Sequence, residues 1–542
     1  MKLSIYGLNE REAFSKAGYH LPDYDIKAVS KKTHDFPMWV HFGAGNIFRA
    51  FHAELAEKLL EKKCISTGIT VCEGYDYEII EKMYRPHDNL SVLVELKADG
   101  KIDKSVIGSI GESVILDSDD QTEFGRMKEI FKADSLQLCT FTVTEKGYSL
   151  VDGRNVLLKA VAEDFENGPD KPLSYIGKVA ALLYTRYCAG KKKIAMVSTD
   201  NCSHNGEKLH DSVLTYAEKW AENKLVDNEF VDYLNDENYV SFPWTMIDKI
   251  TPRPDESVEK ILINDGFADS EPVVTSKNTW VAPFVNAEET EYLVIEDKFP
   301  NGRPSLEKAG VIFTDRDTVN KVERMKVTTC LNPLHTALAV YGCLLGFTRI
   351  SEEMKDSDLV EMVNILGYKE GLPVVVDPGV LDPKKFIDTV INVRIPNPFM
   401  PDTPQRIATD TSQKLAIRFG ETIKAYMSAS DKDTSELNII PLVLAGWLRY
   451  LMAVDDNGRA FQPSPDPFLE SAGNYVKGFK LGEVPDSAKA LERLLPLLKN
   501  KQIFGVDLEE AGLAERVVNL FCRELSGAGA VRETLHCSVR IQ

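Results

Sequence analysis

The chain has 542 residues, with 64 Lys+Arg against 83 Asp+Glu and 43% apolar side chains. Because a single hydrophobic core stops growing at about 250–300 residues, at least two domains are expected. The net charge of −19 argues against a nucleic-acid-binding protein, which needs a basic surface, and against docking on an anionic membrane. An anionic substrate is not excluded, because a local basic pocket can lie inside an acidic protein.

Cysteine usage and the chain ends give no sign of secretion. The nine cysteines are scattered and form no C-x-x-C pair, which argues against a disulfide framework or a structural zinc site. The start, MKLSIYGLNEREAF, lacks the apolar region of a signal peptide. The longest apolar stretches, 336–347 and 441–454, are shorter than the roughly 20 residues of a membrane span. We therefore expect a cytoplasmic protein without a metal, and two buried helices at these stretches.

Strand-like and helical patterns alternate from about residue 37 to residue 300. The run 90–110 differs from this alternation, because two β-rich stretches joined through Asp99-Gly100 indicate a hairpin. Strands that alternate with helices predict βαβ units around a mostly parallel sheet. The strand-like runs are 38–45, 68–74, 90–96, 136–143, 193–199 and 291–297.

Beyond about residue 317 the β pattern fades. Long amphipathic helices are predicted at 412–430, 439–454 and 487–499, separated by Pro and Gly turns. The sequence thus predicts an α/β protein, with a Rossmann-type domain over 1–315 and a mostly α-helical domain over 316–542.

A glycine-rich turn follows the first strand of the parallel sheet. In HFGAGNIFRAF, Gly43 permits a tight turn and Gly45 lets the backbone approach a pyrophosphate. The phosphates would then face the amides at the start of the next helix. The third glycine of G-x-G-x-x-G is Phe48 here, so a plain strand–turn–helix connection is the alternative. On the dinucleotide interpretation, the cofactor-binding residues are Phe42, Gly43, Ala44, Gly45, Asn46, Ile47 and Phe48.

Two acids follow the second strand of the sheet. Glu73 and Asp76 are candidates to bind the ribose hydroxyls of a dinucleotide. An acid at this place favours NAD over NADP, because it repels a 2′-phosphate. Either residue could equally be a solvated loop carboxylate.

Polar residues also follow two later strands. In VSTDNCSHNG, Asp200 and Asn201 would point toward the site, where an asparagine amide can donate to a developing oxyanion. An Asx-turn that caps a helix is the alternative. In MIDKITPRP, Asp248 could accept from substrate hydroxyls, or could form a structural ion pair with Lys249 or Arg253.

The segment MKVTTCLNPLHTALAVYGCLLGF begins a helix near Asn332, since Pro333 is tolerated only in the first turn. Asn332 and His335 then share one helix face. Lys326 lies about 900° from His335 in a continuous helix, so it belongs to the entering segment. A lysine near the positive end of a helix, partly removed from water, suits acid/base chemistry at neutral pH. Taken singly, these residues could be a helix cap, a core histidine and a solvated lysine.

Taken together, the motifs resemble the polyol-specific long-chain dehydrogenase/reductase family, also called the mannitol dehydrogenase family. Its members reduce ketoses and ketose-type sugar acids such as fructose, fructuronate and tagaturonate. The resemblance covers most of the chain and follows one order. The matching segments are HFGAGNIFRAF, TVTEKGYSL (142–150), VSTDNCSHNG, MIDKITP, NGRPSLEKAGVIFT (301–314), 326–335, RIPNPFMPDTPQRIATDTSQKL (394–415) and AGWLRYL (445–451).

The resemblance implies an NAD-dependent enzyme without zinc. Lys326 would be the general acid/base, Asn201 and Asn332 would stabilise the oxyanion, and His335 would orient the substrate or the lysine. Asp248 and Lys249 would contact substrate, and the loop with Thr144 and Glu145 would lie beside the nicotinamide. The sequence departs from the family pattern twice. Five residues rather than four separate Lys326 from Asn332, so an irregular turn is expected, and Lys249 replaces an arginine.

The substrate expected from the resemblance is a sugar acid or a polyol. A carboxylate is best bound by an arginine fork, and Arg394, Asn397, Arg406 and Lys414 lie in the segment where the family binds substrate. We therefore expect interconversion of fructuronate and mannonate, with mannitol 2-dehydrogenase or tagaturonate reductase as alternatives. Arginines on amphipathic helices are otherwise solvated or ion-paired. A catalytically silent protein that binds NAD or a sugar acid is the non-enzyme alternative.

Overall fold

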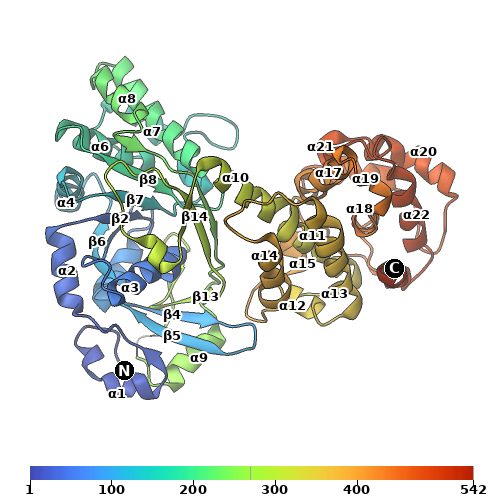
Figure 1. The fold of residues 1–542 in the computed structure, drawn as a ribbon, viewed down its shortest axis with the longest axis horizontal. Coiled ribbons are helices and arrows are strands. Elements are labelled where there is room, and N and C mark those ends of the chain that lie inside the picture. The colour runs from blue at the N-terminus through green and yellow to red at the C-terminus, as the bar shows by residue number, and fades with distance from the viewer. Residues whose placement is uncertain (269, 541–542) are drawn as a thin grey trace. The chain divides into compact units, whose positions relative to one another are not determined.

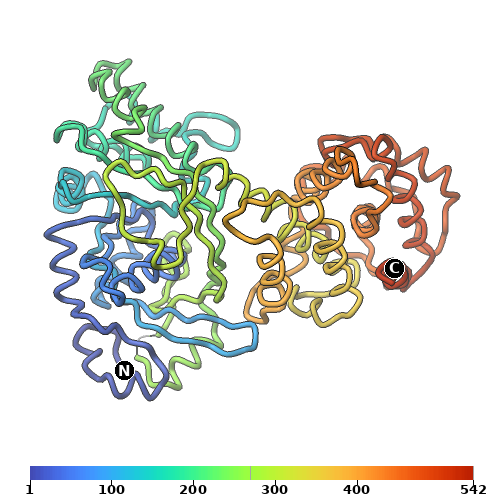
Figure 2. Tube along the Cα trace, viewed as in Figure 1, coloured from blue at the N-terminus to red at the C-terminus, as the bar shows by residue number. Residues whose placement is uncertain are grey.

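The computed structural model describes residues 1–268 and 270–540, which form two compact units. The first unit comprises residues 1–97 and 101–320, and the second comprises 98–100 and 321–542. The sequence placed this border at about residue 315. Strands and helices alternate in the first unit, whereas the second is helical (Figure 1). Figure 2 follows the chain through the first unit, blue to yellow-green, and then through the second, gold to red.

A six-stranded parallel sheet lies at the centre of the first unit. Its strands follow the order β6-β3-β2-β7-β8-β9, and all five neighbouring pairs are parallel. Numbered along the chain within this sheet, the order is 3-2-1-4-5-6, which is that of the Rossmann fold. The predicted fold class is therefore confirmed. The strands are β2 (Trp39–Phe42), β3 (Ile69–Glu73), β6 (Ile110–Ile115), β7 (Leu138–Phe141), β8 (Ile194–Ser198) and β9 (Val240–Ser241).

Both faces of this sheet are covered. All residues of β2, β3, β7 and β8 are buried, as parallel strands packed on both faces require. One apolar core joins the sheet to α4, α6 and α7, and the other joins it to α3 and two strands of further sheets, β13 and β14. The helices are α1 (Arg11–Lys16), α2 (Ile26–Asp35), α3 (Ala53–Glu61), α4 (Gln121–Lys132), α5 (Lys159–Asn167), α6 (Tyr175–Cys188), α7 (Asn205–Glu222), α8 (Asn228–Asn235) and α9 (Glu256–Asn264).

Three smaller sheets complete the first unit. Their orders are β1-β5-β4-β13, β10-β14-β15 and β11-β12. The expected hairpin is confirmed, since β4 and β5 are antiparallel and Gly100 in their connection has φ +83°. The strands are β1 (Tyr19–His20), β4 (Ser91–Leu96), β5 (Ile102–Ile107), β10 (Thr245–Asp248), β11 (Val273–Val274), β12 (Trp280–Val281), β13 (Phe284–Glu288), β14 (Tyr292–Glu296) and β15 (Ile312–Thr314).

The run 291–297 does not continue the βαβ alternation that the sequence predicted. It forms β14, which pairs antiparallel with β10 in a separate sheet. The physical reason is the short connection from β13, which leaves no room for the crossover helix that a parallel neighbour needs.

The second unit packs around two apolar helices, α11 and α18. Every residue of α18 is buried, and the Tyr341 hydroxyl donates to the Leu442 carbonyl over 3.0 Å. Both predicted buried helices are thus present. The helices are α10 (Arg316–Met325, which spans the border), α11 (Asn332–Leu345), α12 (Ile350–Glu353), α13 (Ser357–Asn364), α14 (Pro383–Thr389), α15 (Pro404–Ile407), α16 (Thr411–Leu415), α17 (Glu421–Ser428), α18 (Ile439–Tyr450), α19 (Leu469–Val476), α20 (Ser487–Leu498), α21 (Lys501–Phe504), α22 (Ala514–Glu524) and α23 (Ala530–Arg540).

Several helices contain a π turn, in which the amide of residue i+5 donates a hydrogen bond to the carbonyl of residue i. The predicted helix 412–430 consists of α16, one such turn and α17. Because a π turn adds a residue, it changes which side chains share a helix face, and such turns are frequent at functional sites. The π segments are η2 (Phe48–His52) and η3 (Ile80–Tyr84) in the first unit, and η7 (Lys326–Cys330), η8 (Ile365–Gly371), η10 (Val390–Arg394) and η11 (Ala416–Gly420) in the second.

Candidate active site

The glycine turn after β2 has the backbone geometry that a dinucleotide site needs. Gly43 has φ +106°, and a Cβ on it would lie 2.4 Å from the Thr142 carbonyl oxygen, so only glycine fits. Gly45 differs, since a Cβ there would meet nothing within 4 Å. The first glycine therefore makes the turn, and the second leaves open space beside the backbone.

The helix after this turn packs on the sheet through aromatic rings. Phe48, which replaces the third glycine, is fully buried and stacks on His41 with ring centroids 4.3 Å apart. Phe42 is also a core residue and stacks on Phe141. Gly45, Asn46 and Ile47 are half-buried between these core positions. The residues that can approach a ligand are therefore these three, whereas Phe42 and Phe48 hold the turn in place.

The two acids after β3 have different partners. Glu73 accepts from the Ala44 amide with one carboxylate oxygen, and from the Tyr75 and Asp76 amides with the other. Burial raises the pKa of Glu73, and these three amide hydrogen bonds oppose the rise. Asp76 accepts from the Thr275 hydroxyl over 2.6 Å, while its Oδ1 is buried without a partner among the described residues. Glu73 thus fixes the loops, whereas Asp76 keeps one carboxylate oxygen unused by those residues.

Asp200 joins the loops that follow β7 and β8. Its carboxylate accepts from the Val143 and Thr144 amides, at 3.0 and 2.8 Å, and from the Tyr148 hydroxyl. These bonds hold Thr144 at φ +67°. Glu145 is exposed and pairs with Lys208. Asp200 therefore holds the two loops together, because three donors of the protein already occupy its carboxylate.

Asn201 is exposed and comes directly after Asp200, beyond the carboxyl end of β8. The glycine turn, Thr144 and Asn201 thus follow the carboxyl ends of β2, β7 and β8, which are neighbours in the sheet. Ligands of open α/β sheets bind at this edge, where the strand order reverses between β2 and β7.

Asp248 and Lys249, at the end of β10, differ in their surroundings. Asp248 is buried. The Lys249 side chain is fully buried, and its ammonium pairs with Glu291 over 2.9 Å and with Glu54 over 3.6 Å. Lys58 pairs with the same two glutamates. Lys249 is therefore held in a structural ion-pair cluster with Glu54 and Glu291.

In the second unit, Lys326 opens the π turn η7 and is buried. The Leu331 amide donates to the Lys326 carbonyl over 3.1 Å, an i to i+5 bond that adds one residue to this turn. Leu331 itself leaves the helical conformation, with φ −130° and ψ −61°. Lys326 and His335 are therefore not in the register of a continuous α-helix, in which they would lie roughly 180° apart. This π turn is the irregular turn that the extra residue required.

Asn332 is the first residue of α11, followed by Pro333, as the sequence predicted. Asn332 and His335 are half-buried. The Thr336 hydroxyl donates to the Asn332 carbonyl over 2.9 Å. The start of α11 thus presents an amide and an imidazole next to the turn that carries Lys326.

The four candidate substrate-binding residues between positions 394 and 414 differ in burial. Arg394, at the end of η10, is buried, and Asn397 is buried in the following turn, where its Oδ1 accepts from the Phe399 amide over 3.0 Å. Arg406 is ion-paired with Asp402. Lys414 is half-buried and donates to the Thr409 carbonyl.

One further base near α11 was missed in the sequence. Arg418, in η11, donates to the Thr336 hydroxyl. Burial lowers its pKa to about 10. The signal that could have identified it is its spacing, since it lies four residues after Lys414, one helical turn away.

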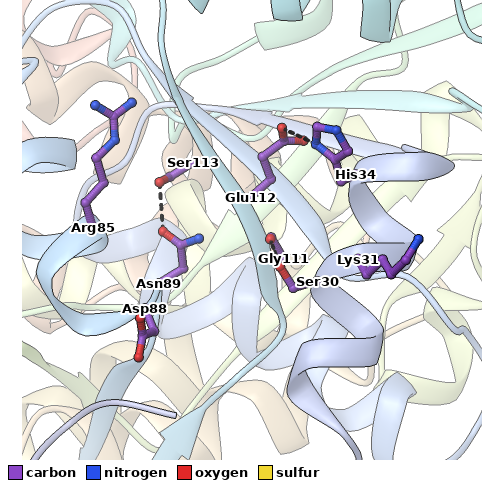
Figure 3. Close-up of a pocket in the computed structure, with 9 residues that line it drawn as sticks. All are labelled: Ser30, Lys31, His34, Arg85, Asp88, Asn89, Gly111, Glu112 and Ser113. Carbon is purple, nitrogen blue, oxygen red and sulfur yellow. Dashed lines mark hydrogen bonds and ion pairs between the residues drawn. The ribbon is translucent and has the colours of Figure 1, made fainter. Parts of the chain in front are cut away.

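A polar hollow of about 490 Å³ lies on the first unit (Figure 3). It borders the edge strand β6 rather than the carboxyl ends of the strands. Within it, Glu112 is bound to His34 over 3.0 Å, and Ser113 donates to Asn89 over 2.7 Å (Figure 3). Its position separates it from the edge of the sheet that carries the glycine turn.

Among the described residues, no cluster of three or more His, Cys, Asp or Glu side chains could hold a metal ion. In the same part of the chain, no helix is long and apolar enough to cross a membrane.

Comparisons with known proteins identify the family over both units. Residues 37–308 match the family model of the mannitol dehydrogenase Rossmann domain, and residues 318–523 match that of the mannitol dehydrogenase C-terminal domain. The chain is 52% identical to the D-mannonate oxidoreductase of Thermotoga maritima over 99% of this chain and 98% of that protein.

Two solved structures share the fold. A substrate-free D-sorbitol dehydrogenase matches with a TM-score of 0.78 at 26% identity, over 95% of this chain and 97% of that one. The Pseudomonas fluorescens mannitol 2-dehydrogenase, a ternary complex with NAD and D-mannitol, matches with a TM-score of 0.68 at 25% identity over 100% of both chains. The chain therefore belongs to the mannitol dehydrogenase family of oxidoreductases.

Proposed function

We propose that this chain is an NAD-dependent D-mannonate oxidoreductase, which interconverts mannonate and the ketose-type sugar acid fructuronate. The observation that carries the proposal is the 52% identity to a D-mannonate oxidoreductase over 99% of the chain. It is supported by three unusual local features that fit such an enzyme: the positive-φ Gly43 turn, the buried Lys326 and the π turn that follows it.

The residues around the glycine turn fit a dinucleotide. Open space beside Gly45 admits a pyrophosphate close to the backbone, where the amides at the start of the helix would face it. The unpartnered Oδ1 of Asp76 would accept from a ribose hydroxyl, which favours NAD over NADP. Thr144 would border the nicotinamide. When bound, NADH supplies the hydride for the reduction.

Lys326 acts as the general acid in the reduction direction and as the general base in the oxidation. In the reduction, the ketone carbon gains the hydride and its oxygen takes a proton from the Lys326 ammonium. Asn332 and Asn201 donate their amide hydrogens to this oxygen as negative charge develops on it. His335, in the first turn of α11, orients the substrate or the lysine. Asp248, Arg394 and Asn397 contact the rest of the substrate, whereas Lys249 stays in its ion pairs with Glu54 and Glu291.

Steady-state assays of NADH oxidation test the assignment, with fructuronate, tagaturonate and fructose offered in parallel. We expect the highest kcat/KM with fructuronate, and a lower KM for NADH than for NADPH. A preference for fructose would overturn the sugar-acid assignment in favour of a mannitol 2-dehydrogenase. NADH binding without turnover of any of the three would overturn the enzyme assignment.

We also propose a reduced cytoplasmic setting, without nucleic-acid or membrane partners. All nine cysteines are free thiols, and the net charge of −19 disfavours association with polyanions. A lack of DNA retention in gel-shift assays is the expected outcome.

A further inference from the structure

Arg418 is a half-buried cation that lacks the partners of a structural arginine. Its guanidinium donates to the Thr336 hydroxyl and forms no ion pair with any described residue. Partial removal of this charge from water lowers the pKa of Arg418. A guanidinium in this state can pair with an anion that is present only in the complex.

Two fully buried arginines of the chain show what a structural role looks like. Arg186 and Arg449 are each fully buried. Their guanidinium groups are surrounded by backbone carbonyls: those of Phe131, Ala133, Leu136 and Lys193 for Arg186, and those of Val454, Asp455 and Glu524 for Arg449. Arg418 has one hydroxyl instead, so most of its five N–H donors have no acceptor among the described residues.

A second cation stands one helical turn earlier. Lys414 donates to the Thr409 carbonyl and forms no ion pair with a described residue. Burial lowers the pKa of Lys414, and the nearby Arg418 lowers it further, while Asp410 and Asp466 oppose this. Two like charges four residues apart on a helix repel each other. The pair therefore forms a local positive site within a chain of strongly negative net charge.

The cation pair lies beside the proposed catalytic groups of the second unit. Thr336, to which Arg418 donates, follows His335 directly and itself donates to the Asn332 carbonyl. The π turn η11, which carries Arg418, packs against both η7 and α11. A ligand bound to Arg418 is thus within reach of the groups that would act on its ketone.

We propose that Arg418, assisted by Lys414, binds the carboxylate of the sugar acid and so sets the preference for sugar acids over neutral polyols. This inference rests on the proposed function. A guanidinium can give two parallel N–H donors to a carboxylate, whereas a neutral polyol presents only a hydroxyl at that position. Substrate binding then neutralises the charge of Arg418.

The test compares Arg418→Met with the wild-type enzyme on D-mannonate and on D-mannitol, which has a hydroxymethyl group in place of the carboxylate. Because a hydrogen bond to a charged group is lost, we expect the KM for mannonate to rise about 10- to 100-fold while kcat changes little. The ratio of kcat/KM for mannonate to that for mannitol should fall by a similar factor. Calorimetric binding of mannonate to the enzyme–NAD complex should weaken equally.

Three controls separate the outcomes. Arg418→Lys should recover part of the mannonate affinity, and guanidinium added to Arg418→Met should rescue it. Arg493→Met, which changes an exposed arginine of α20, should leave the kinetic constants unchanged. Equal losses for mannonate and mannitol, or an unchanged KM, would overturn the inference. A wild-type enzyme that turns over no sugar acid would instead overturn the proposed function, and this inference with it.

Discussion

The two units contribute candidate residues by different means. The first unit uses backbone, because a glycine turn and the open space beside it mark the proposed place for a dinucleotide. The second unit uses charged side chains, two of which, Lys326 and Arg418, lie in π turns. A pyrophosphate suits the first arrangement, since amides at a helix start bind phosphate without a full charge. Proton transfer needs ionisable groups, which only side chains supply.

Buried acids differ in how they are partnered. Glu73 and Asp200, in the first unit, each accept from three donors, so their carboxylates hold the backbone of the loops in place. Glu353, in the second unit, is fully buried and neither of its oxygens has a hydrogen-bond partner among the described residues. The first arrangement stabilises the ionised carboxylate, and the second disfavours it.

The largest effect should come from Lys326→Ala. Loss of a general acid/base lowers the rate about 10²- to 10⁴-fold, so we expect kcat to fall within this range while the affinity for NADH, measured by fluorescence titration, stays unchanged. Lys424→Ala, which removes an exposed lysine paired with Glu421, is the matched control. Full activity of Lys326→Ala would remove the lysine from the mechanism and break the contrast between the two units.

The two glycines of the turn should respond differently to the same change. Gly43→Ala places a Cβ 2.4 Å from the Thr142 carbonyl at φ +106°, and should destabilise the protein by about 1–3 kcal/mol. Gly45→Ala meets no atom, so the melting temperature should stay constant while the dissociation constant for NADH rises. Denaturation and NADH titration of both variants measure these outcomes. An unaltered NADH affinity of Gly45→Ala would contradict the proposed approach of the pyrophosphate.

The smallest effect should come from Glu353→Gln. Burial raises the pKa of Glu353 well above its usual value, with Asp356 contributing, so the folded state retains a proton that the unfolded state releases above about pH 4.5. Stability is therefore lost as the pH rises through this value, and the neutral variant escapes this loss. We expect Glu353→Gln to be more stable than the wild type at pH 8, and nearly equal to it at pH 4.

Urea denaturation at the two pH values measures the difference. Glu352→Gln, which changes an exposed neighbour paired with Lys355, should show no such dependence on pH. Equal stability of Glu353→Gln and the wild type at both pH values would contradict a raised pKa of Glu353, and the contrast between Glu353 and the hydrogen-bonded acids would not hold.

The sequence by itself determined the features that depend on neighbouring residues. The order of strands and helices, the Gly43 turn and the start of α11 at Asn332 follow from local chain geometry, in which apolar spacing, a glycine or a proline acts within a few residues. The need for an irregular turn after Lys326 also followed from residue counting, although its form did not.

Only the tertiary structure decided which of these residues remain available to a ligand, because their partners come from distant parts of the chain. Asp76 meets Thr275, 199 residues away, while Glu73 is occupied by the Ala44 amide, 29 residues before it. Lys249 is held by Glu54 and Glu291. Arg418 reaches Thr336 across 82 residues and finds no acid there. Residue type and spacing indicate which interactions a side chain can make. Tertiary packing determines whether another part of the protein already makes them.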